Sequence, residues 1–190
     1  MLFAIMRQKQ YSFYKPISPR FGGDLQKGKR KGQRPLDPKS TIHLVLKSSR
    51  ATGPWSLLHR QNKLRIYDLL VRLAKQNGVK IYRYANVGNH LHVLVKLQDR
   101  AGFQKFLRIF SGRVAMLITS ARKGHPQGKF WDSLAFTRIV NWGKDFERIT
   151  YYFFKNEIEG FGYPLAFARE LAERGVVFET GPLCRRDSMV

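Results

Sequence analysis

The segment Asn89–Val95, which reads NHLHVLV, constrains the fold of this chain more than any other. Its β-branched and apolar residues predict a β-strand, in which alternate side chains point to opposite faces. His90 and His92 therefore share one face. Same-face neighbours lie about 7 Å apart at their Cα atoms, so both imidazoles can bind one ion. The pattern predicts half of a metal site. Because the chain has five histidines among 190 residues, two partly buried structural histidines are the alternative interpretation.

The charge balance indicates a polyanionic partner. The chain has 35 Lys and Arg against 13 Asp and Glu, a net charge of +22, which favours nucleic acid or an anionic membrane surface. No apolar run is long enough to predict a membrane span, and the apolar residues 1–6 lack the features of a signal peptide. Cys184 is the only cysteine, which rules out a disulfide within the chain. We therefore expect a cytoplasmic protein that binds nucleic acid.

Composition divides the chain into three parts. Residues 1–39 lack apolar periodicity and include the basic run Lys27–Pro35, which predicts a mobile N-terminal arm that binds phosphates by charge. The alternative is a solubilising tail, although aromatic residues in it also suggest packing on the domain. Residues 40–163 form the predicted domain, and residues 164–190 a C-terminal extension.

The periodicity of the domain predicts an α+β fold. Strands are expected at 41–48, 79–86, 89–95 and 130–141, and helices at 61–76, 100–122 and 145–159. The order β-α-β-β-α-β is that of a ferredoxin-like antiparallel sheet with two helices on one face, here followed by an additional C-terminal helix. In that fold the first strand and the histidine strand are the central pair. The two helices cover the apolar face and leave the histidine face to a ligand or to the additional helix.

The additional helix contains residues that can complete a metal site. Tyr152 and Asn156 are four residues apart and share a helix face, whereas Tyr151 pairs with Lys155, which cannot bind a cation. If this helix packs on the histidine face, Asn156 can offer its amide oxygen to the ion, with the Tyr152 phenol beside it. By themselves, these aromatic residues are more typical of core packing.

Two motifs together resemble a known family. Residues 88–95 are similar to the His-hydrophobic-His motif of the HUH endonucleases. With the later Tyr-x-x-x-Asn, the domain resembles the single-tyrosine transposases of small insertion sequences, most closely the REP-associated tyrosine transposases. Gly88 and Glu157 depart from the family, which commonly has proline at both positions.

The resemblance implies cleavage and joining of single-stranded DNA next to hairpins through a covalent 5′-phosphotyrosine. It makes Tyr152 the nucleophile and His90, His92 and Asn156 the ligands of Mg²⁺ or Mn²⁺. It further implies a ferredoxin-like fold with a C-terminal catalytic helix, a homodimer, and a location at the bacterial nucleoid.

Other interpretations stay open. The chain can instead be a non-catalytic nucleic-acid-binding module on a ferredoxin-like sheet, or a relaxase or replication initiator with the same chemistry. His43, on the neighbouring predicted strand, is expected to be structural first and to orient the site second.

Overall fold

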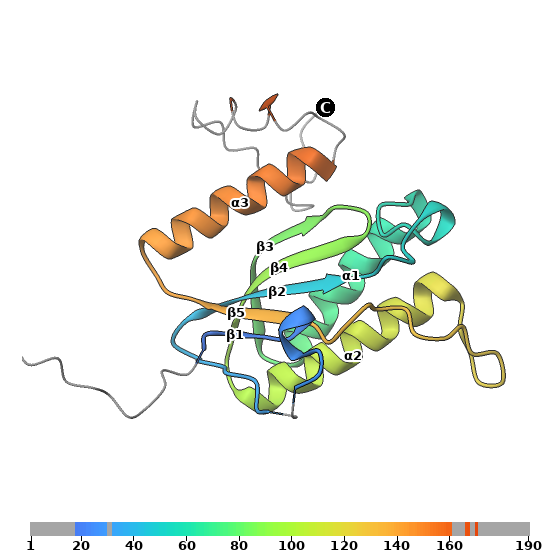
Figure 1. The fold of residues 1–190 in the computed structure, drawn as a ribbon, viewed down its shortest axis with the longest axis horizontal. Coiled ribbons are helices and arrows are strands. Elements are labelled where there is room, and N and C mark those ends of the chain that lie inside the picture. Colours follow the sequence, from blue (N-terminus) through green and yellow to red (C-terminus); the bar gives the residue numbers. More distant parts are fainter. Residues whose placement is uncertain (1–17, 30–31, 161–165, 168–169, 171–190) are drawn as a thin grey trace, which may run out of the picture.

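A computed structural model describes residues 18–29, 32–160, 166–167 and 170 as an α+β domain (Figure 1). The strands are β1 (Arg20–Phe21), β2 (Thr41–Lys47), β3 (Val79–Asn86), β4 (His90–Leu97) and β5 (Phe136–Val140). The helices are α1 (Arg60–Gln76), α2 (Arg100–Thr119) and α3 (Lys144–Gly160), with short 3-10 helices at Gly23–Gln26 and Gly53–Trp55. The predicted β-α-β-β-α-β order is confirmed, with one further strand at the N-terminal side.

The strand order is β1-β5-β2-β4-β3, and every pair is antiparallel. β3 and β4 form the predicted hairpin, and β2 and β4 are neighbours at the centre of the sheet. Val45 lies opposite His92, and His43 lies opposite Leu94. This register places His43 and His92 on the same face of the sheet, because directly opposite residues share a face.

Helices cover both faces of the sheet (Figure 1). α1 and α2 pack on the face formed by Leu44, Leu91, Val93 and their neighbours, and together they enclose the larger core. α3 packs on the opposite face, where Ile149 and Phe153 bury a smaller core with Leu94. The additional helix therefore covers the histidine face, which is one of the two arrangements that the sequence left open. No helix in the described part of the chain is long and apolar enough to cross a bilayer.

The buried face of α1 differs from the prediction. The spacing of three and four residues between Leu64, Tyr67, Leu70, Val71 and Ala74 predicts that these residues face the core. Leu64 and Val71 are instead 62% and 41% exposed. Ile66, Leu69 and Leu73 are buried instead. Apolar residues with helical spacing occur on two overlapping stripes of this helix, and periodicity cannot choose between them. The sheet accommodates the stripe that contains Ile66.

Three predicted boundaries were wrong. α2 ends at Thr119, because Ser120 adopts a left-handed conformation with φ 55°. β5 starts at Phe136, since the residues before it wrap around the end of β2, where Ser49 donates to the Asp132 carboxylate at 2.8 Å. The sequence predicts Asp145 as the N-cap of the last helix, but α3 starts at Lys144. Asp145 lies within the first turn, and its carboxylate accepts from the backbone N–H of Asn141.

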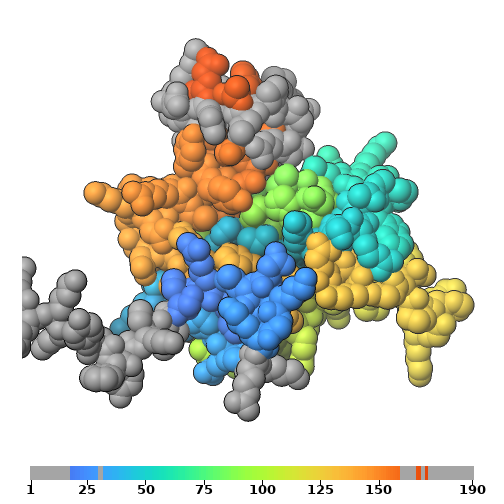
Figure 2. Space-filling model, viewed as in Figure 1, coloured from blue at the N-terminus to red at the C-terminus, as the bar shows by residue number. Residues whose placement is uncertain are grey.

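Part of the predicted N-terminal arm belongs to the folded domain. Phe21 is buried and β1 pairs with β5, while the Arg34 guanidinium donates to Ala135 O and Thr137 Oγ1 at 2.8 and 2.6 Å. The described N-terminal segment, blue in Figure 2, lies against the body of the domain. Residues 1–17 of the predicted arm and most of the predicted extension lie outside the described residues.

A glycine substitution tests whether β1 is an integral part of the domain. Gly22 and Gly28 both have positive φ, at 85° and 70°, but only at Gly22 would a Cβ overlap the carbonyl oxygen of Ala135. Gly22 also has ψ −168°, a backbone conformation that is essentially restricted to glycine, so Gly22→Ala combines this backbone cost with the close approach, and Gly28→Ala controls for the loss of a glycine with positive φ. We expect Gly22→Ala to lower the free energy of unfolding by about 1 to 3 kcal/mol more than Gly28→Ala, measured by urea denaturation. Equal losses would mean that β1 is detached from the domain in solution.

Candidate active site

A pair of hydrogen-bonded histidines lies at the centre of the sheet. His43 Nε2 and His92 Nδ1 are 3.0 Å apart, and the two rings stack with their centroids 5.3 Å apart. Both side chains are buried, at 6% and 3% exposure. His43 thus contacts a predicted metal ligand directly, which agrees with the orienting role that the sequence analysis placed second.

Burial keeps both histidines neutral. Desolvation, with a smaller effect of the Arg138 charge, lowers the pKa of His43 to about 4. Desolvation, with smaller effects of His43 and His90, lowers the pKa of His92 to about 2. Each ring of the pair therefore has one N–H and one lone pair at neutral pH.

His90 lies beside His92, with ring centroids 4.6 Å apart. Its Nδ1 is hydrogen-bonded to the Asn89 side-chain oxygen. Because that oxygen only accepts, the proton of a neutral His90 is on Nδ1 and the lone pair is on Nε2. This tautomer is the one in which a histidine binds a metal through Nε2 while its other nitrogen is held by an acceptor.

Among the buried histidine nitrogens of the site, His92 Nε2 differs in its lack of a described partner. It is buried and has no hydrogen-bond partner in the part of the chain that the structure describes, although buried polar atoms are nearly always satisfied. If His92 Nδ1–H donates to His43, then Nε2 has a free lone pair that a cation would satisfy. The alternative tautomer would bury an unpaired N–H, which costs roughly 1 to 3 kcal/mol. The donor set therefore fits a metal ion.

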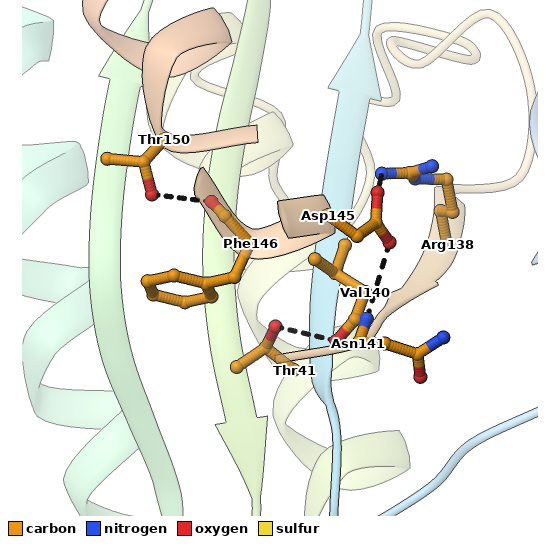
Figure 3. Close-up of polar contacts among 7 residues, drawn as sticks. All are labelled: Thr41, Arg138, Val140, Asn141, Asp145, Phe146 and Thr150. Atoms are coloured by element: carbon orange, nitrogen blue, oxygen red, sulfur yellow. Dashed lines mark hydrogen bonds and ion pairs between the residues drawn. The ribbon is translucent and has the colours of Figure 1, made fainter. Parts of the chain in front are cut away.

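α3 is fixed to the sheet at its first turn (Figure 3). The Arg138 guanidinium forms an ion pair with the Asp145 carboxylate at 2.7 Å, and the same carboxylate accepts from Asn141 N. Further along α3, Phe153 is fully buried and lies edge-on to His43, with ring centroids 5.3 Å apart. These contacts set the rotation of α3, and with it the side chains that face the histidines.

Tyr152 lies beside the histidine pair. Its ring centroid is 5.4 Å from that of His92 and 6.0 Å from that of His43. The side chain is 39% exposed, so it can meet a substrate. Tyr151 is similarly exposed, at 44%, but makes no aromatic contact with the described residues. The structure thus brings Tyr152, and not Tyr151, next to His92.

Asn156 is buried one helical turn after Tyr152. Its Nδ2 donates to the Tyr152 carbonyl oxygen at 2.6 Å, and the side chain is 5% exposed. That bond uses the amide nitrogen, so the oxygen is the atom that suits a cation. No cluster of three His, Cys, Asp or Glu residues occurs within the described ranges. Asn156 is the third metal ligand that the sequence analysis predicted.

The sequence analysis missed two supporting residues. Asn89, within the histidine motif, sets the tautomer of His90. Its side-chain oxygen is an acceptor next to a predicted metal ligand in the sequence, so this role could have been predicted from the motif. Arg138 lies opposite His43 in the β2–β5 register and holds Asp145. Its role depends on that register, which the sequence does not contain.

The buried histidine pair predicts acid sensitivity. Both residues have folded pKa values below the unfolded value of about 6.5, so at lower pH the unfolded chain binds more protons than the folded chain. The free energy of unfolding should therefore fall as the pH drops from about 6.5 to 4, by up to ~1.4 kcal/mol per pH unit for each histidine. We expect His43→Leu, measured in EDTA, to lose about half of this contribution. The exposed-loop variant His125→Gln is the control, and identical pH dependence in His43→Leu and wild type would contradict the account.

Comparison with known protein families assigns the chain to one of them. Residues 39–152 match the family described as IS200-like transposases, a segment that covers more than half of the 190 residues and includes both motif histidines and Tyr152. No curated protein matches the chain. A REP-associated tyrosine transposase bound to a REP hairpin is 15% identical with a TM-score of 0.47, covering 78% of this chain and 88% of that chain. A protein assigned as a transposase from Deinococcus radiodurans R1 is 18% identical with a TM-score of 0.41, covering 67% of this chain and 97% of its own. On the family match, the chain belongs to the IS200-like transposases, a family of DNA-processing enzymes.

Proposed function

We propose that this transposase is a metal-dependent endonuclease and strand transferase that cleaves single-stranded DNA next to hairpins through a covalent 5′-phosphotyrosine. One observation carries the proposal: the exposed phenol of Tyr152 lies beside His92, whose Nε2 is buried and unsatisfied. A phenol and a buried nitrogen without a described partner thus adjoin each other on one face of the sheet. The preference for hairpins rests on the resemblance of the motifs.

His90 and His92 would hold a Mg²⁺ or Mn²⁺ ion through their Nε2 atoms, with the amide oxygen of Asn156 as a third ligand. Such an ion, when bound, neutralises charge on the scissile phosphate and polarises it. His43 Nε2, 3.0 Å from His92 Nδ1, would accept the Nδ1 proton and so keep the lone pair of His92 on Nε2. Asn89 does the same for His90. Neutral nitrogen and oxygen ligands leave room for phosphate oxygens.

Tyr152 is the nucleophile in this proposal. Its phenol loses the proton to solvent, and the phenolate oxygen attacks phosphorus in line with the leaving 3′ oxygen. The new O–P bond joins Tyr152 to the 5′ phosphate, the P–O3′ bond breaks, and the 3′ oxygen leaves as a hydroxyl after taking a proton. Attack by a 3′-OH on the phosphotyrosine reverses these bond changes and rejoins DNA without a nucleotide cofactor.

The geometry favours an enzyme over a non-catalytic binding module. Such a module stacks bases on exposed aromatics of the central strands. Here α3 covers that face, where Leu94 is fully buried and His92 is 3% exposed. The relaxase and replication-initiator alternative is less well supported, because the family match is to IS200-like transposases. A homodimer stays a prediction.

Loss of the Tyr152 hydroxyl tests the nucleophile. We expect wild type incubated with Mn²⁺ and a 3′-labelled single-stranded hairpin DNA to form a labelled covalent adduct on a denaturing gel, because the strand on the 3′ side of the cut stays joined to Tyr152. Tyr152→Phe should form none, because no oxygen remains to attack phosphorus. Tyr151→Phe is the matched control, since Tyr151 lies next to Tyr152 on α3 with similar exposure, and it should keep the adduct. The opposite pattern would reassign the nucleophile.

Metal removal tests the histidines. Adduct formation should stop in EDTA and return with Mn²⁺ or Mg²⁺. His90→Ala or His92→Ala should lower adduct formation by at least about tenfold at limiting metal. Loss of even a supporting group at a metal site lowers metal affinity or activity 10- to 100-fold. His125→Ala, in an exposed loop, should match wild type. Undiminished cleavage in EDTA by all of these proteins would disprove the metal site.

A further inference from the structure

A rigid, exposed aromatic surface lies on the same side of the sheet as the histidines. Trp142 is 47% exposed, yet three contacts hold it in place. Its Nε1 donates to Lys39 O at 2.9 Å, and its ring centroid is 4.9 Å from that of Phe146 and 5.6 Å from that of Tyr82. An aromatic ring that is both fixed and exposed is ready to stack on a flat ligand, because little conformational freedom is lost on binding.

Two lysines flank this ring. Lys80 and Lys96 lie directly opposite each other on β3 and β4, where like charges are unfavourable. Their ammonium groups are 5.2 Å from the ring centroid of Tyr82 and 5.8 Å from that of Trp142, respectively. Neither lysine forms an ion pair with a carboxylate of the described residues. An anion between them would relieve the repulsion. We call Trp142, Tyr82, Phe146, Lys80 and Lys96 the Trp142 platform.

The platform adjoins the candidate active site. Lys96 is four residues after His92 on β4 and points to the same face. At 3.3 to 3.4 Å per residue, the two positions are about 13 Å apart along the strand. A stacked DNA strand rises about 3.4 Å per nucleotide along its axis, so at most about four nucleotides separate the platform from the histidines.

We propose that the Trp142 platform binds the single strand of DNA that flanks the cleavage site, with one unpaired base stacked on Trp142 and the adjacent phosphates bound by Lys80 and Lys96. This inference rests on the proposed function, because the strand bound by the platform is the one that Tyr152 would cleave. Aromatic rings interleaved with lysines are the chemistry of single-strand binding. In a duplex the bases stack on one another and are not free to stack on a tryptophan.

The test separates binding from cleavage by using full-length Tyr152→Phe protein. The probe is a 12-nucleotide oligodeoxythymidylate, and the readouts are fluorescence anisotropy and quenching of tryptophan emission. We expect Trp142→Leu to weaken binding about tenfold, since stacking contributes 1 to 3 kcal/mol per base, and to lose most of the quenching. Trp142→Phe should retain most of the affinity. Circular dichroism checks that both variants are folded, and the same-length duplex should bind Trp142→Leu and the parent protein equally.

The lysines are tested through the salt dependence of binding. The double variant Lys80→Gln/Lys96→Gln should reduce the slope of log K against log salt by about 1.4, which corresponds to two phosphate contacts at 0.7 each. The matched control is Lys63→Gln/Lys75→Gln, on the exposed surface of α1 on the other side of the sheet. An equal decrease in both double variants would indicate general charge attraction and overturn the specific site.

The outcomes distinguish this inference from the proposed function. Unchanged oligonucleotide affinity in Trp142→Leu would overturn the platform, even if wild type forms the Tyr152 adduct. Conversely, a tenfold loss in Trp142→Leu together with no adduct in wild type would support the platform as a binding surface and reject the nuclease chemistry. Shortening the single strand of the hairpin DNA on its 5′ side and then on its 3′ side should reduce the affinity of the parent protein, and Trp142→Leu should lose this sensitivity on one side only.

Discussion

The hydrogen bond between His43 and His92 is the interaction on which the candidate site depends. It links the two central strands of the sheet through a pair of buried, neutral imidazoles. Because it occupies Nδ1 of His92, the other nitrogen of that ring is left as a buried atom without a described partner. A buried polar group without a partner destabilises the fold, and a cation bound to this nitrogen would remove that cost. His90 lies beside His92, and its Nδ1 is held by the Asn89 side-chain oxygen.

α3 completes the candidate active site, because it both buries the two histidines and carries Tyr152. Its apolar residues Ile149 and Phe153 bury the face of the sheet on which the histidines lie, which lowers their pKa values by desolvation. The same helix places Tyr152 at the boundary between this core and solvent. Arg138 and Asp145 fix the start of the helix (Figure 3). Burial of the histidines and presentation of the phenol are thus two consequences of one packing interaction.

Much of this could be predicted from local patterns. Alternation in Asn89–Val95 placed His90 and His92 on one face, and the four-residue spacing of Tyr152 and Asn156 placed them on one side of α3. Features that depend on contacts between distant parts of the chain could not be predicted from the sequence. The contact between His43 and His92 depends on the register of β2 and β4, and the buried stripe of α1 depends on how the helix meets the sheet. β1 has only two residues, too few for a periodic signal.

The protonation of His92 tests the account most directly. Nitrogen-15 NMR of the histidine side chains in the metal-free protein at neutral pH distinguishes a nitrogen that carries a proton from one that does not. The account predicts that His92 has its proton on Nδ1 and a bare Nε2, and that addition of a diamagnetic divalent ion such as Mg²⁺ or Zn²⁺ shifts the Nε2 resonance. A proton on Nε2 of His92, with no response to the ion, would contradict it.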